Sequence, residues 1–250
     1  PDLIHVNDWH TGYLPNYLST VYTEDPQLKH ISTLLSMHNL YQGISFDFDH
    51  ASQMDFDDGK GPLAPFFSDK FLKQNPLKRG FIHADIVNTV SQTYSREIMT
   101  EEYGHKLHTL FKELRGKLFG VLNGIDYSSF NPKTAKIIKN NFSVNSFGDR
   151  SQNKIDLQKE FDLTVSPGTP ILSILGRLDD QKGLDLVAQT MDFILSECDV
   201  QLVVLGTGDN RFRDLFEELE KKYPSRVGTH LMFDASLPKK IYDGSDKILI

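Results

Sequence analysis

Two cations follow one apolar strand of this sequence, at a spacing that suits an anionic ligand. Arg177 and Lys182 lie in the stretch GRLDDQKGLDL (176–186), between the apolar run ILSIL and a segment with the spacing of an amphipathic helix. The free N–H groups and partial positive charge of a helix N-terminus favour anions. Arginine adds a planar fork for phosphate oxygens and lysine a mobile point charge, and Gly183 lets the backbone approach a ligand. The turn therefore predicts a site for a diphosphate or a sugar nucleotide.

The same spacing also fits a solvated turn. In that interpretation the guanidinium of Arg177 pairs with Asp179 or Asp180, which follow it closely in the sequence. The residue types alone leave both interpretations open.

A second glycine-containing turn follows the next apolar run, at LGTGD (205–209). A G-x-G after a strand suggests a dinucleotide fingerprint, but Arg211 stands where the third glycine belongs. A nicotinamide oxidoreductase is therefore disfavoured. Gly206 and Gly208 instead predict a tight turn that brings backbone amides to a ligand.

The histidines and the cysteine do not form a recognisable metal or nucleophile motif. His5, His10 and His38 lack an H-E-x-x-H spacing or a nearby paired C-x-x-C, so hydrogen-bonding roles are favoured over metal ligation. No G-x-S-x-G elbow is present in the sequence. Cys198 is predicted to be a packed thiol, far from the carboxyl ends of the strands.

Residues 44–76 have no clean hydrophobic period and are rich in Asp, Phe, Gly and Pro. This composition predicts a long irregular loop with one short helix. Asp55, Asp57 and Asp58 lack the alternation and the terminal glutamate of a calcium loop, and we interpret them as a solvated acidic loop.

The composition limits the class of protein. The chain has 250 residues, 39% of them hydrophobic and 24% charged, and a formal net charge of −7. Nucleic acids and anionic membranes are disfavoured as partners because both require a broad positive field. The single cysteine allows no intrachain disulfide and favours a reducing compartment. No apolar run is long enough to span a membrane and no signal peptide is recognised, and both ends fall at predicted strands, so we expect an internal piece of a longer protein.

Strands and helices alternate along most of the sequence. Strands are predicted at 3–6, 31–38, 84–91, 117–122, 170–175, 200–205, 226–232 and 246–250. Helices are predicted after the first strand, at 92–104 with Ser91 as N-cap, within the polar region 133–161, and at 183–196, 210–222 and 236–243. This alternation predicts parallel, right-handed βαβ sheets, with a domain break near 120–130.

Ligands of such sheets bind at the carboxyl ends of the strands. Polar or small residues follow the predicted strands at Asp8, His10, His38, Ser91, Asn123, Arg177, Lys182, 206–209 and Phe233. A site at these strand ends is therefore expected in each half of the chain.

Seven blocks of the sequence, taken in order, carry a resemblance to a known family. They are NDWHTGYLPNYL, SMHNLYQG, LKRG with ADIVNTVSQTYSREI, GVLNGIDYSSFNP, GRLDDQKGLDL, QLVVLGTGD and FDASLPKKIYDGSDKILI. The ordered set is similar to bacterial glycogen synthases and plant starch synthases, which form glycosyltransferase family 5. The resemblance covers the chain except for 44–76 and 133–160.

The resemblance implies an α/β fold of GT-B type, in which two Rossmann-like parallel-sheet domains face each other across a cleft. Each domain would be incomplete here: residues 1–122 would end the N-terminal, acceptor-side domain, and residues 123–250 would begin the C-terminal domain that binds the nucleotide sugar. It implies transfer of glucose from ADP-glucose to an α-1,4-glucan with retention of configuration, without a metal or redox cofactor. The location would be the bacterial cytoplasm or a plastid.

The resemblance also implies roles for individual residues. Arg177 and Lys182 match the pair that binds the donor diphosphate and stabilises the leaving nucleotide. His38 matches the histidine that contacts the transferred glucose, and Asp8 a carboxylate that contacts the sugar. The other residues matched to donor binding are Asn123, Gly206, Gly208 and Phe233, the last placed beside the adenine.

Several positions depart from the family pattern. Asn7 replaces a histidine, Arg79 stands where a small residue is expected, and the HNLYQG block is one residue short, which affects Tyr41 and Gln42. A K-x-G-G-L loop and an E-x-C-G-L segment of the family would lie outside residues 1–250, so this piece alone is predicted to be inactive. Two alternatives stay open: a related transferase that uses UDP-glucose or another donor, and a non-catalytic glucan-binding relative.

Overall fold

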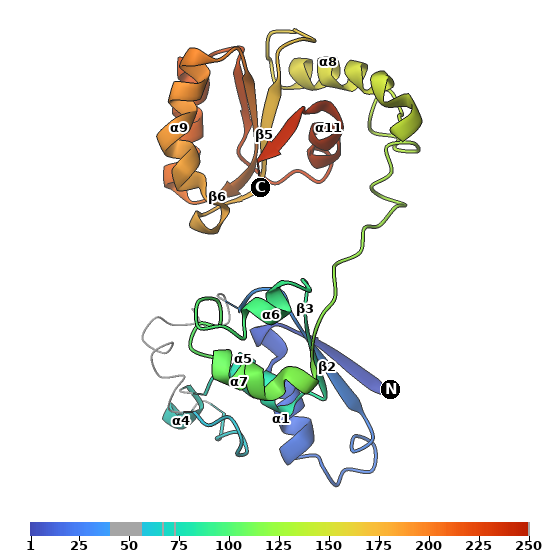
Figure 1. The fold of residues 1–250 in the computed structure, drawn as a ribbon, viewed down its shortest axis with the longest axis vertical. Coiled ribbons are helices and arrows are strands. Elements are labelled where there is room, and N and C mark those ends of the chain that lie inside the picture. The colour runs from blue at the N-terminus through green and yellow to red at the C-terminus, as the bar shows by residue number, and fades with distance from the viewer. Residues whose placement is uncertain (41–56, 67, 73, 250) are drawn as a thin grey trace. The chain divides into compact units, whose positions relative to one another are not determined.

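The chain divides into two compact units, Pro1–Gly124 and Ile125–Ile250. A computed structural model describes residues 1–40, 57–66, 68–72 and 74–249 of the chain. Each unit contains one parallel sheet of four strands flanked by helices (Figure 1). The predicted α/β class with two parallel sheets is therefore confirmed. Tyr41, Gln42, Asp55 and the first part of the irregular segment 44–76 lie outside the described residues.

The first unit is built on a sheet with the strand order β1-β2-β3-β4. Its strands are β1 (Leu3–Asn7), β2 (Ser32–Met37), β3 (Ile86–Thr89) and β4 (Leu118–Gly120). Its helices are η1 (Trp9–Thr11), α1 (Tyr13–Thr20), α4 (Asp69–Leu72), α5 (Pro76–His83), α6 (Tyr94–Glu97), α7 (His108–Glu113) and η3 (Leu114–Gly116). Alternate residues of a strand point to opposite faces, so Val87 is buried in the core whereas Ile86 is exposed.

The helices of the first unit differ in part from the sequence-based expectation. The helix predicted over 92–104 contains only the single turn α6. The hydroxyl of Ser91 accepts a hydrogen bond from the N–H of Tyr94 at 3.1 Å, but the N-cap of α6 is Thr93, whose side chain makes no capping bond, so the predicted N-cap is wrong. The helix ends early because the N–H and hydroxyl of Thr100 both bond the carbonyl of Glu97, a local pattern that competes with the helix. Helices α5 and α7 were not predicted.

The second unit has the strand order β7-β6-β5-β8. Its strands are β5 (Ile171–Leu178), β6 (Gln201–Gly208), β7 (Val227–His230) and β8 (Lys247–Leu249). Its helices are η4 (Val144–Arg150), α8 (Ser151–Glu160), η5 (Asp180–Lys182), α9 (Leu184–Glu197), α10 (Asn210–Lys222) and α11 (Leu237–Gly244). The predicted order of elements from β5 to β8 is confirmed, although β5 and β6 run on to Leu178 and Gly208.

Both faces of the second sheet are covered. Leu202 and Val204 of β6 pack into a core with α9 and α10, while the alternate residues Val203 and Leu205 pack into another with α8 and α11. A parallel sheet with helices on both faces needs apolar side chains on both, which explains the continuous apolar run of β6.

The strand order of the second unit places a topological switch point beside β5. The chain passes from β5 to β6 and β7 on one side and then returns to β8 on the other side of β5. In open α/β sheets the crevice at the carboxyl ends of such strands is the usual ligand site.

The predictions for residues 133–143 and for Cys198 are wrong. Residues 133–143 form turns and bends and not part of a helix, because asparagine side chains take up backbone groups: Asn141 donates to the carbonyls of Pro132 and Ala135. Cys198 is exposed at the end of α9 and is not a packed thiol.

No helix among the described residues is long and apolar enough to cross a membrane.

Candidate functional site

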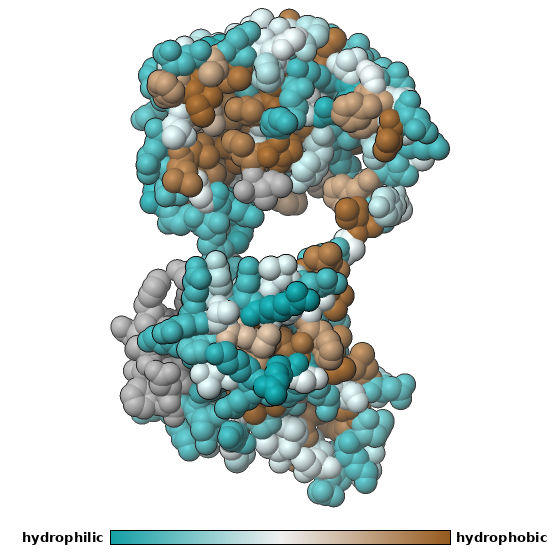
Figure 2. Space-filling view, in the orientation of Figure 1, coloured by the Kyte–Doolittle hydropathy of each residue, from teal (hydrophilic) through white to brown (hydrophobic). Residues whose placement is uncertain are grey.

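Arg177 and Lys182 reach the same crevice of the second unit. Arg177 lies near the end of β5 with 60% of its side chain exposed, and Lys182 ends the turn η5. Gly183 follows with φ 64°, a left-handed conformation that favours glycine, and begins the 14-residue helix α9. A cavity of about 400 Å³ lies between these residues, β5, β8 and α9. On the face shown in Figure 2, apolar surface surrounds this region between α9 and β8.

The two interpretations of this turn are both represented in the structure. Nη1 of Arg177 lies 3.3 Å from Oδ2 of Asp179, which is the pairing expected of a solvated turn. An exposed pair of this kind contributes little, and a guanidinium has further donors free for an anion. In the described part of the chain, Lys182 forms no salt bridge within 4.0 Å. The crevice therefore presents two cations beside a helix N-terminus, at the switch point of the sheet.

A second cavity, of about 340 Å³, lies at the carboxyl ends of β5 and β6 and shares Arg177 with the first. Its other lining residues are Leu175, Gly176, Leu205, Gly206, Thr207, Met232, Phe233, Asp234, Pro238 and Tyr242. Phe233 is 84% exposed, so its ring is available to a ligand. Apolar and aromatic walls with few polar groups suit a flat base. The sequence placed Phe233 at a strand end, but Met232 and Tyr242 were not singled out, although Tyr242 lies in the block FDASLPKKIYDGSDKILI.

Gly206 and Gly208 have a packing role that differs from the prediction. They lie within β6 and not in a turn, paired with Gly176 and Leu178 of β5. A Cβ on Gly206 would lie 2.0 Å from the carbonyl oxygen of Gly176, and one on Gly208 would lie 2.3 Å from that of Leu178. The glycines therefore allow the two strands to approach closely. Gly206 also lines the second cavity, whereas Gly208 is not among its lining residues.

Asp8 and His38 join the carboxyl ends of β1 and β2 in the first unit. Oδ1 of Asp8 accepts a hydrogen bond from the backbone N–H of His38 at 2.7 Å, and Oδ2 lies 3.2 Å from Nδ1 of the same residue. A carboxylate in this position holds the proton on Nδ1 and leaves Nε2 directed elsewhere. Asp8 has φ 53° and ψ −166°, a backbone conformation that is rare outside glycine. Strain of this kind is common at functional sites.

The remaining predicted residues do not line the cavities at the strand ends of the second unit. Asn123 is exposed in the irregular segment after β4 and lines none of the cavities described above. The ring of His10 stacks on Trp9 at 3.9 Å, and Nε2 of His5 bonds the hydroxyl of Ser36 at 2.7 Å. Among the described residues, no group of three or more His, Cys, Asp or Glu side chains could hold a metal ion.

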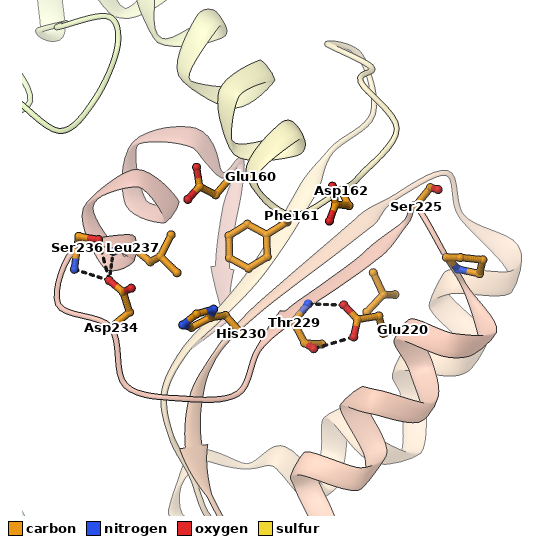
Figure 3. A pocket seen from close by; sticks show the side chains of 12 residues that line it. Glu160, Phe161, Asp162, Glu220, Ser225, Thr229, His230, Asp234, Ser236 and Leu237 are labelled. Carbon is orange, nitrogen blue, oxygen red and sulfur yellow. Dashed lines mark hydrogen bonds between the residues drawn. The ribbon is translucent and has the colours of Figure 1, made fainter.

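A further cavity of the second unit, about 480 Å³, lies beside the edge strand β7 and shares Asp234 with the second cavity (Figure 3). Glu220, one of the carboxylates that line it, accepts hydrogen bonds from the N–H and hydroxyl of Thr229. Oδ1 of Asp234 accepts from the N–H groups of Leu237 and Ser236, at 2.8 and 2.6 Å. The bond from Leu237, followed by those from Ser236, lowers the pKa of Asp234 to about 2. The hydrogen bonds of Glu220 and Asp234 therefore stabilise the local fold around this cavity.

Arg79 and Asp57 form a buried ion pair that the sequence did not reveal. Nε and Nη2 of Arg79 donate to the two oxygens of Asp57 at 2.8 and 2.7 Å, and Nη1 donates to Oδ1 of Asn16 and the carbonyl of Gly61. Both charged residues are at most 8% exposed, so the interpretation of Asp57 as part of a solvated loop is wrong. Burial lowers the pKa of the neighbouring His83. The guanidinium of Arg79 is therefore buried with hydrogen-bond acceptors at all three of its nitrogens.

Comparison with known proteins gives a consistent result. A family model described as the starch synthase catalytic domain matches residues 1–113. Over 252 aligned residues the chain is 42% identical to the glycogen synthase of Thermotoga petrophila, covering 100% of this chain and 51% of that protein. Over its whole length the chain is similar to glycogen synthases and starch synthases. It spans about half the length of the curated relatives that it matches.

Solved structures of the family and of its fold agree. The catalytic domain of starch synthase IV from Arabidopsis thaliana, bound to ADP and acarbose, superposes with a TM-score of 0.81 and 28% identity, covering 99% of this chain and 51% of that one. Anabaena Alr3699/HepE, in complex with UDP and glucose, matches with a TM-score of 0.54 and 16% identity over 99% of this chain and 52% of that one. The second likeness shows the fold alone. The predicted GT-B class of this glycogen and starch synthase relative is therefore confirmed.

Proposed function

We propose that the whole protein is a retaining glucosyltransferase that extends an α-1,4-glucan from ADP-glucose. The observation that carries the proposal is the convergence of Arg177 and Lys182 on the switch-point crevice, beside the N-terminus of α9. The 42% identity to a glycogen synthase over the full chain supports the same reaction. The glycogen synthase that is 42% identical over the full chain is bacterial, so a bacterial cytoplasm is the proposed location.

In this proposal the two cations act on the leaving group. When the bond between the sugar carbon and the diphosphate oxygen breaks, negative charge develops on the departing ADP. Arg177 and Lys182 would stabilise that charge, which is an electrostatic contribution made mainly in the transition state. The aromatic and apolar cavity that contains Phe233 would hold the adenine beside them.

The first unit would supply the sugar contacts. Asp8 holds the Nδ1 edge of His38, which would direct Nε2 of that histidine toward a hydroxyl of the transferred glucose. Asn123 is proposed as a further contact near the donor, on the resemblance of its LNGID block alone. The nucleotide sugar and the glucan would be the partners of the protein, without a metal or redox cofactor. With a net charge of −7, nucleic acids and anionic membranes are not proposed as partners.

The test is glucose transfer onto glycogen by the full-length protein, with ADP-glucose and UDP-glucose compared. We expect ADP-glucose to be preferred, and turnover to persist in excess EDTA. Arg177→Ala and Lys182→Ala should each lower kcat by roughly 10² to 10³-fold, the range seen when one transition-state donor is removed. Lys221→Ala, which removes a side chain that is 77% exposed on α10, is the matched control and should leave kcat unchanged. Preference for UDP-glucose would reassign the donor, and a folded protein that uses neither donor would contradict catalysis.

The non-catalytic alternative rested partly on Arg79, which departs from the family pattern. The structure gives this residue a bidentate partner in Asp57 and two further acceptors. In this chain the guanidinium of Arg79 is bonded within the first unit and has a structural role there. Arg79 therefore does not favour a non-catalytic relative.

A further inference from the structure

Arg211 stands where a dinucleotide fingerprint would have its third glycine, and its side chain reaches a neighbouring turn. Its Nη2 forms an ion pair with Oδ1 of Asp180, and its Nε lies 3.3 Å from Oδ2 of Asp209. The guanidinium carbon also lies 4.4 Å from the centre of the Phe212 ring, which restricts its position. The hydrogen bond to Asp180 raises the pKa of Arg211, followed by the charges of Asp180, Asp209 and Asp185.

The ion pair links the two βα turns of the candidate site. Arg211 lies in the first turn of α10, directly after β6, whereas Asp180 begins η5, directly after β5. Lys182 ends the same three-residue turn that Asp180 begins. Arg211 therefore contacts the segment that carries one of the two cations of the crevice.

An uncompensated aspartate at this place would oppose anion binding. Asp180 is two positions from Lys182 and is 71% exposed, so without Arg211 its carboxylate would be free to turn toward the ammonium group. Such a pair would compete with a diphosphate for the charge of Lys182. Nη1 of Arg177 already lies 3.3 Å from Oδ2 of Asp179. Of the two cations in the described crevice, Lys182 is therefore the one without a carboxylate within salt-bridge distance.

We propose that Arg211 is a positioning residue for donor binding: it holds the carboxylate of Asp180 away from Lys182 and so keeps that ammonium available to the diphosphate. This inference rests on the proposed function, since it assumes that the crevice binds a nucleoside diphosphate. It assigns to Arg211 an electrostatic role exerted through Asp180, without contact with the ligand.

The experiment is calorimetric titration of the full-length protein with ADP, without glucan, at low salt. We expect Arg211→Ala to weaken ADP binding by about three- to fivefold, which is the upper end of what one exposed ion pair contributes. Asp180→Asn should bind ADP within about twofold of the wild type, because it removes the competing charge. The double variant Arg211→Ala/Asp180→Asn should recover the affinity that Arg211→Ala loses. Arg211→Lys should keep most of the wild-type affinity for ADP.

Lys222→Ala provides the matched control. Nζ of Lys222 lies 2.6 Å from Oδ1 of Asp192, so this pair also joins α10 to α9 on the surface, but at the opposite end of α10. Its loss should leave ADP affinity unchanged. At about 0.5 M salt, screening should also reduce the difference between Arg211→Ala and the wild type.

The outcomes separate the inference from the proposed function. If the wild type binds ADP and Arg211→Ala binds it equally well, the inference is overturned and the proposed function stands. If the double variant stays as weak as Arg211→Ala, Arg211 acts by holding the turn and not through the charge of Asp180, which also overturns it. If the wild type binds neither ADP nor inorganic pyrophosphate, the proposed function is wrong and the inference falls with it.

Discussion

Asp8 illustrates at the scale of one residue how stability and function compete in this chain. Its backbone adopts φ 53° and ψ −166°, a region that costs non-glycine residues about 1–3 kcal/mol. In return, the carboxylate reaches both the backbone N–H and the ring of His38. A glycine would fit the backbone better but could not hold the histidine. The backbone conformation does not favour aspartate at this position, and the contacts of the carboxylate with His38 are what the side chain adds.

This predicts an inverted order of stability for two substitutions of Asp8. Asp8→Gly and Asp8→Ala both lose the carboxylate, but only glycine relieves the backbone. We expect Asp8→Gly to have the larger free energy of unfolding, by about 1–3 kcal/mol, although alanine is favoured by about 0.4–1 kcal/mol at ordinary positions. Urea denaturation followed by the fluorescence of Trp9, the one tryptophan of the chain, measures it in the first unit.

The same pair of substitutions at Lys112, an exposed residue of α7, is the control and should show the ordinary order. If alanine is at least as stable as glycine at position 8, the backbone strain is not real. In the full-length protein both Asp8 variants should lose glucose transfer to a similar extent, because both leave His38 unsupported.

Residues of the site differ in how far the sequence could predict them. The placement of Arg177, Lys182 and Phe233 at the carboxyl edge of a parallel sheet was predictable because each lies at or soon after the end of an apolar strand, whereas their roles stay predictions. The pairing of Asp57 with Arg79 could not be predicted, because the two residues are 22 positions apart and nothing in the local sequence marks either side chain as buried. Long-range pairing of charges depends on tertiary structure, which sequence periodicity does not report.

At the scale of elements, the second unit was predictable from periodicity where the chain alternates cleanly between apolar strands and amphipathic helices. Prediction failed over 133–143, where polar side chains bond the backbone, and over 92–104, where a threonine does. Helix propensity was outweighed in both places by local hydrogen bonds from side chains. Helix α5 was missed although Asn75 caps it through the N–H of Lys78 at 2.8 Å and Pro76 begins it, both of which are sequence signals.

Arg79 of helix α5 bonds Asn16 of α1 and the segment that contains Asp57 and Gly61. We therefore expect the effects of substituting Arg79 and Asp57 on stability to be strongly coupled. Arg79→Ala should lower the free energy of unfolding by about 3–5 kcal/mol, because Asp57 is left as a buried, unpaired charge. Asp57→Ala should cost a similar amount. The double variant should cost at least about 2 kcal/mol less than the sum of the two, because neither charge is then left alone.

Urea denaturation followed by Trp9 fluorescence measures this cycle in the first unit. Lys112→Ala, at an exposed position of the same unit, should change the free energy by no more than about 0.5 kcal/mol. Simple additivity of Arg79→Ala and Asp57→Ala would show that the two side chains do not interact in solution.

At the scale of the whole molecule, the proposed reaction divides its work between two units that each have their own sheet and core. The second unit contains both cavities at the carboxyl ends of its strands and both phosphate-binding candidates. The first contains the Asp8–His38 pair. Assignment of the nucleotide to the second unit and of the glucan acceptor to the first is the remaining part of the proposal.

Hydrogen exchange of the full-length protein with and without ADP tests this division. ADP should slow amide exchange at 176–184, 205–208 and 232–242, because these backbone segments surround the two cavities of the second unit. Exchange within β1 to β4 should change little when no sugar is attached to the nucleotide. Lys182→Ala should weaken the protection at 176–184 at a fixed ADP concentration, whereas Lys221→Ala should preserve it, since Lys221 is 77% exposed on the distal part of α10. Protection confined to residues 1–124 would place the nucleotide in the first unit, and the roles of the two units would then have to be exchanged.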